Sequence, residues 1–193
     1  MSSAADAPDA PDTLPEGLVI RPLTGADGEA FDVFRGAALA RDPAAFSTSA
    51  EDWQAAPIKV RQALAADGNG AHGVLLGAFR EQAGEMRLIG TLGAKRSPRV
   101  QVRHVATLWG LVVEPAARGK GVATALIRAV MAALAEMDGV DRVRAMVAAE
   151  SDAARAVIAK AGFRDYGLEE GGRRVRDGDA WRDVDLVYVM RRL

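Results

Sequence analysis

The sequence contains no cysteine and only two histidines. The absence of cysteine excludes disulfide bonds, a cysteine nucleophile and thiolate metal sites, although it does not identify a cellular compartment. His72 and His104 lie too far apart in the sequence to form a local zinc motif. We therefore expect no bound metal.

The sequence also lacks long apolar runs and an excess of charge of one sign. No run of about eighteen apolar residues is present, so we expect no membrane span. The N-terminus shows no basic segment followed by an apolar one, so no signal peptide is evident and we expect a cytoplasmic protein. The 25 basic and 26 acidic residues give a net charge of −1, which gives no sign of a nucleic-acid partner.

The sequence contains enough apolar residues to form one hydrophobic core. Its 193 residues, 49% of them apolar, are typical of a single globular domain. Residues 1–16 are mostly Ala, Pro and Asp, with almost no bulky apolar side chain, so burial cannot offset the entropy lost on ordering. We predict an acidic disordered tail over residues 1–16 and one domain over residues 17–193.

The most informative stretch of the chain runs from Leu108 to Val130. Its apolar start, Leu108 to Val113, is followed by Pro115 and predicts a buried strand that ends there. The next residues, RGKGVA, leave successive backbone N–H groups uncovered at the start of a helix, where the helix dipole favours an anion. That helix is predicted from an apolar stripe at Val122, Leu126, Val130 and Leu134. The stretch therefore predicts a phosphate-binding turn.

Other phosphate-binding motifs fit this stretch less well. Glu114 and Gly121 occupy the positions where a P-loop requires a glycine and a hydroxyl residue. A dinucleotide-binding fingerprint requires a small residue where Thr124 stands, and it also requires several further strand–helix units. A strand-to-helix turn that binds nothing remains the alternative.

The order of strand, proline, turn and helix closely resembles motif A of the GNAT superfamily of acetyl-CoA-dependent N-acetyltransferases. That motif, Gln/Arg-x-x-Gly-x-Gly/Ala, is found here as Arg118, Gly121 and Ala123. The resemblance covers about residues 17–193 and implies that acetyl-CoA is a cosubstrate. It also implies an α+β fold with a mostly antiparallel sheet of six or seven strands, about four helices and a splayed central pair of parallel strands. The predicted element order, β-α-α-β-β-β-α-β-α-β-β, agrees with the α+β class.

The resemblance assigns the coenzyme contacts mainly to backbone groups. The turn would bind the pyrophosphate, and the strand before it would pair with the pantetheine amides. Ser151 stands where the family has an Asn before a later helix. The predicted coenzyme contacts are therefore Leu111, Val112, Val113, Arg118, Gly119, Lys120, Gly121, Val122, Ala123, Thr124 and Ser151.

Groups for the chemical step are less evident. The backbone N–H of Val113 is the predicted donor to the thioester carbonyl, whose oxygen becomes negative during attack. The family's glutamate base falls on Thr107, and its tyrosine acid falls on Ile158; neither residue can transfer the proton. His104 has a suitable pKa range and is our predicted base, with a structural role as the alternative.

These observations predict an N-acetyltransferase that acts by direct attack of a primary amine in a ternary complex. The acceptor would be a small molecule or a peptide, and by analogy the loops around Phe46 and Trp181 would shape its pocket. The missing glutamate and tyrosine favour an alternative, a catalytically weak sensor module that binds coenzyme A. Homodimers are common in this family, so a homodimer is one expected assembly.

Overall fold

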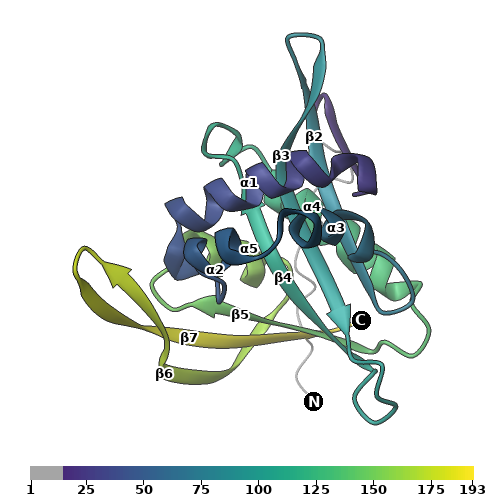
Figure 1. Cartoon of the computed structure of the whole chain (residues 1–193). Coiled ribbons are helices and arrows are strands. Elements are labelled where there is room, and N and C mark those ends of the chain that lie inside the picture. Colours follow the sequence, from purple (N-terminus) through teal and green to yellow (C-terminus); the bar gives the residue numbers. More distant parts are fainter. Residues whose placement is uncertain (1–14) are drawn as a thin grey trace.

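The computed structural model describes residues 15–193, so the tail predicted for residues 1–16 lies outside the described residues except for its last two (Figure 1). Over this range, seven strands form one sheet in the order β1-β2-β3-β4-β5-β7-β6. Every neighbouring pair is antiparallel except β4 and β5. The strands are β1 (Leu18–Pro22), β2 (Gly73–Gln82), β3 (Glu85–Arg96), β4 (Val105–Val113), β5 (Arg142–Ala148), β6 (Arg164–Asp177) and β7 (Ala180–Arg192). The predicted fold class is confirmed.

Helices cover both faces of the sheet. Within residues 15–193 there are five α-helices: α1 (Gly28–Arg41), α2 (Ala50–Ala55), α3 (Ile58–Asp67), α4 (Val122–Ala135) and α5 (Asp152–Lys160). One more is found than expected because Pro57 separates α2 from α3. The first three pack on one face, and α4 and α5 pack on the other (Figure 1). None of these helices is both long and apolar enough to cross a membrane.

Helix α4 forms the centre of the larger core. The predicted stripe of Val122, Leu126, Val130 and Leu134 is at most 1% exposed. Each such side chain contributes about 1.5–3 kcal/mol when it is fully buried. This burial fixes the N-terminal end of α4 directly after the end of β4.

The two halves of the sheet are joined by a very short parallel ladder. Strands β4 and β5 pair only between Val105–Thr107 and Arg142–Arg144, so the strands separate beyond that point. A β-bulge places Gly110 and Leu111 of β4 opposite the single residue Leu92 of β3. Gly110 has a φ of +66°, a conformation that glycine adopts without strain. The splay implied by the family resemblance is therefore present, and it exposes one edge of β4.

Candidate functional site

The loop between β4 and α4 forms a turn of uncovered backbone donors. We refer to residues Arg118–Thr124 as the glycine turn. Gly119 and Gly121 have φ values of +72° and +79°, and a Cβ atom at Gly119 would meet nothing within 4 Å. Among the residues that the structure describes, none accepts a hydrogen bond from the N–H groups between Gly119 and Thr124. These donors and the dipole of the 14-residue α4 are suited to bind an anion.

The charged side chains of the glycine turn are held by the protein itself. Arg118 Nε donates to Val113 O at 3.1 Å, and its Nη2 lies 2.7 Å from Asp42 Oδ2. Lys120 Nζ donates to Ala116 O at 2.8 Å. Burial raises the pKa of Asp42, but the hydrogen bonds from Arg41 and Arg118 outweigh it and hold the pKa below its ordinary value. The backbone of the turn, rather than its side chains, is therefore the part available to an anion.

The open edge of β4 presents a further backbone donor near the turn. Glu114 N–H donates to Ile89 O of β3 at 2.9 Å. Because N–H groups alternate between the two edges of an antiparallel strand, the N–H of Val113 points away from β3. On that side β5 has already separated from β4, since their pairing ends at Thr107. The N–H of Val113 is thus directed into the gap between the strands.

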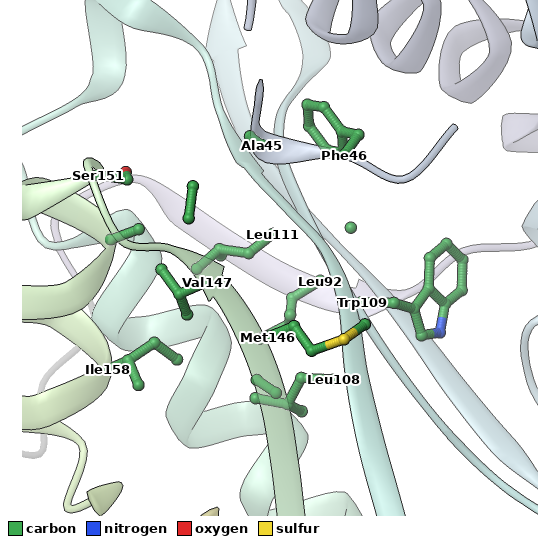
Figure 2. A pocket seen from close by; sticks show the side chains of 14 residues that line it. Ala45, Phe46, Leu92, Leu108, Trp109, Leu111, Met146, Val147, Ser151 and Ile158 are labelled. Carbon is green, nitrogen blue, oxygen red and sulfur yellow. The ribbon is translucent and has the colours of Figure 1, made fainter. Parts of the chain in front are cut away.

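A cavity lies in this gap, with about 110 Å³ accessible to water. Figure 2 shows Phe46 and Trp109 on one side of it, and Val147 and Ile158 on the other. Its lining comes from β3, β4, β5, α5 and the segment around the short 3-10 turn η2 (Pro43–Ala45): Ala45, Phe46, Leu92, Leu108, Trp109, Gly110, Leu111, Ala145, Met146, Val147, Ala148, Ser151, Ala154 and Ile158.

Several predicted site residues meet around this cavity. Leu111 and Ser151 line it, and Ser151 makes no side-chain cap bond to α5. Val112 is only 5% exposed and packs into the core beneath α1, on the other face of the strand. Ile158, at the family's tyrosine position, is 4% exposed and also lines the cavity.

His104 is not part of this arrangement. It lies in the turn before β4, where its carbonyl accepts a hydrogen bond from Asp141 N–H at 3.0 Å. Val113 is nine residues further along the chain, a distance of about 30 Å in an extended strand. The base role predicted for His104 therefore receives no support from this geometry. Among residues 15–193, no group of three or more metal-ligating side chains could hold an ion.

The sequence analysis missed an arginine beneath the cavity wall. Arg35 of α1 is 9% exposed, and its Nε and Nη1 atoms are buried without a hydrogen-bond partner. Burial lowers the pKa of this guanidinium from its ordinary value. A signal was present, because Arg35 lies one helical turn from Phe31 and from Leu39, two apolar residues that are buried in α1.

Comparison with known proteins gives a family match and many similar folds. Residues 38–163 match the family model described as the acetyltransferase (GNAT) family. No curated protein matches the chain. An acetyltransferase of the GNAT family from Streptococcus pneumoniae is 17% identical, with a TM-score of 0.77, and the match covers 91% of this chain and 99% of that one.

Two further solved structures are similar and were determined with ligands. A GNAT superfamily phosphinothricin acetyltransferase from Sinorhizobium meliloti, in complex with AcCoA, is 19% identical with a TM-score of 0.72; the match covers 92% of this chain and 89% of that one. NAA60 from Arabidopsis thaliana, in complex with a bisubstrate analogue, is 19% identical with a TM-score of 0.66; the match covers 91% of this chain and 99% of that one. At these identities the likeness concerns the fold.

Proposed function

The chain belongs to the acetyltransferase (GNAT) family, since the family model matches more than half of it, and from this premise we propose that it is an N-acetyltransferase. It would transfer an acetyl group from acetyl-CoA to a primary amine of a small molecule or a peptide, by direct attack in a ternary complex. The observation that carries this proposal is the glycine turn, whose N–H groups have no partner within residues 15–193 and follow the splayed edge of β4.

The residues of this chain fit acetyl-CoA. The glycine turn has free donors and an open space at Gly119 for a diphosphate, and the unpaired edge of β4 can bond the pantetheine amides. Ser151 and Leu111, at the cavity, would contact the pantetheine arm. When bound, acetyl-CoA supplies an activated acetyl thioester. The N–H of Val113 would donate to the carbonyl oxygen as its negative charge develops.

Proton transfer would depend on solvent more than on a dedicated side chain. Ile158 and Thr107 replace the family's acid and base, and His104 lies at the far end of β4. The amine would therefore lose its proton to water before attack. Holding two substrates in contact already supplies a large part of the rate acceleration, because it removes the entropic cost of bringing them together.

Two measurements on the full chain test this proposal. Calorimetry with acetyl-CoA should show binding, and thiol release with a panel of amines should show turnover. Absence of binding at millimolar acetyl-CoA would reject the proposal. Ile158 at the tyrosine position favours a second candidate, a sensor of coenzyme A, which would bind tightly and release no thiol with any amine. The single domain over residues 17–193 and a homodimer remain predictions.

A further inference from the structure

Among the described residues, the Arg35 guanidinium is a buried positive charge with no counter-ion. No carboxylate in this range forms an ion pair with it, and two of its nitrogen atoms make no hydrogen bond. Burying a charged group without a hydrogen-bonded partner is costly, and such exceptions are few in folded proteins. The position of Arg35 in the molecule therefore needs an explanation beyond packing.

The nearest acid on the same helix is already engaged. Asp32 accepts a hydrogen bond from Trp53 Nε1 at 2.9 Å and lies 3.3 Å from Arg61 Nε. The buried carboxylate of α1 is thus engaged by Trp53 and Arg61, which leaves the charge of Arg35 unbalanced among the described residues. An anion is the ligand that would balance it.

Three aromatic rings surround the guanidinium, and two of them also line the cavity. We call Phe46, Trp53 and Trp109 the aromatic cluster; their ring centroids lie 5.8, 5.1 and 5.5 Å from Arg35 Cζ. Phe46 and Trp109 line the cavity (Figure 2). Aromatic faces attract the cation without using its N–H donors, so these donors stay available for an anion.

The bulge in β4 brings Arg35 close to the proposed site of reaction. A Cβ atom at Gly110 would lie only 3.1 Å from Arg35 Nη1, and Gly110 itself lines the cavity. The bulge lies three residues before Val113, whose N–H is the proposed carbonyl donor. An anionic group bound by Arg35 would therefore lie close enough to the acetyl group for one small acceptor molecule to reach both.

We propose that Arg35 recognises a carboxylate on the acceptor, so that the substrate is a small amine that also carries an acid group, as an amino acid does. This inference rests on the proposed acetyltransferase function. A planar guanidinium matches a carboxylate because two parallel N–H groups can donate to its two oxygens. A small molecule is favoured over a protein because Arg35 is only 9% exposed and the cavity beside it is small.

Matched acceptors test the inference through turnover. Thiol release is measured with a panel of amino acids and with the primary amide of each one. We expect kcat/KM for the acids to exceed that for their amides by about 10- to 100-fold, mainly through KM, because a charge-assisted hydrogen bond is lost in the amide. In Arg35→Gln this preference should fall to near one, whereas Arg35→Lys should retain part of it.

A binding measurement separates this inference from the proposed function. Trp53 and Trp109 lie beside Arg35, whereas Trp181 is 60% exposed and does not line the cavity, so in a Trp181→Phe background tryptophan fluorescence reports on this region. Amino acids, but not their amides, should shift this signal with and without acetyl-CoA, and Arg35→Gln should abolish the shift. If no amine is acetylated while the acids still shift the signal, the proposed function fails and the anion site stands.

Several results would overturn the inference. It is wrong if amides and acids are acetylated equally well. It is also wrong if Arg35→Gln weakens acetyl-CoA binding, because the positive charge of Arg35 would then serve the coenzyme. It is also wrong if an amidated peptide with an N-terminal aspartate is a better acceptor than every free amino acid. The wild-type comparison of acids and amides requires no variant, so the test remains valid if Arg35→Gln does not fold.

Discussion

At the N-terminal end of α4, the glycine turn offers an anion a row of backbone N–H groups and no free cationic side chain, because Arg118 and Lys120 are held by the protein. At the cavity wall, the aromatic cluster surrounds the guanidinium of Arg35, and the recognition groups are side chains from α1, α2, β4 and the segment after η2. The first arrangement suits a ligand shared by a whole family, since any sequence that keeps the turn keeps the donors. The second can change with single substitutions, which is what acceptor specificity requires.

The largest expected effect concerns the side chains that pack around Arg35. Asp32→Ala leaves the buried N–H of Trp53 without its acceptor and the Arg61 guanidinium without its ion-pair partner. We expect the free energy of unfolding, measured in urea, to fall by about 3 kcal/mol. Glu29→Ala removes an exposed carboxylate from the same helix and should change it by less than about 0.5 kcal/mol. Equal effects of the two substitutions would contradict this account of the cluster.

The next effect concerns the backbone donors of the glycine turn. Gly119→Ala places a methyl group in the space proposed for the diphosphate, and we expect acetyl-CoA affinity in calorimetry to fall about tenfold, or about 1.4 kcal/mol. Gly178→Ala is a matched control, because Gly178 also has a positive φ, +62°, and open space around it. Both variants should lose about 1–2 kcal/mol of stability from backbone strain. Only Gly119→Ala should weaken binding; a similar loss in Gly178→Ala would show that strain alone is responsible.

A smaller effect concerns how the helical layer is anchored at the start of α1. Hydrogen bonds from Arg21, at 2.8 Å, lower the pKa of Asp27 to about 2, below its ordinary value of 3.8. Because the pKa is lower in the folded state, the pair stabilises the fold above about pH 4, and this stabilisation is lost as the pH falls towards 2. Arg21 is 42% exposed, so solvent screening limits the contribution to about 1 kcal/mol.

Asp27→Asn should therefore be less stable than the wild type by about 1 kcal/mol at pH 7. The difference in unfolding free energy between the two proteins should shrink to near zero at pH 2. A difference that stays constant across this pH range would show that the charge of Asp27 is not its source.

The smallest effect concerns Arg118, whose side chain links the glycine turn to Asp42 at the end of α1. Arg118 bonds Val113 O and Asp42, but its side chain is 50% exposed, so Arg118→Ala should cost at most about 0.5 kcal/mol of stability. We expect acetyl-CoA affinity to fall only about two- to threefold, and less at high salt. Arg174→Ala breaks a similarly exposed pair with Asp183 and should leave the affinity unchanged. A tenfold loss in Arg118→Ala would mean that this side chain leaves Asp42 to bind the coenzyme.

The contrast between a local backbone turn and side chains that meet only through packing also explains which features could be predicted from the sequence. The glycine turn and the stripe on α4 are local patterns, so the fold class and the place of the uncovered backbone donors could be predicted from them. Arg35, Trp53 and Trp109 meet only through the packing of α1 and α2 on β4, and no local spacing records that contact. The imidazole of His104 suggests a base, but a sequence does not show how far along a strand the reaction takes place.

The three residue pairs that join β4 to β5 also bear on how the chain folds. Strands β2, β3 and β4 follow one another in sequence and in the sheet, and β6 and β7 form a hairpin, so each of these blocks can assemble from contacts close along the chain. The junction between the blocks begins with residues 105 and 142, so it closes a longer loop than these hairpins and gains only three residue pairs. We expect this seam to form after the hairpins in refolding, so the cavity would take shape only once they are in place.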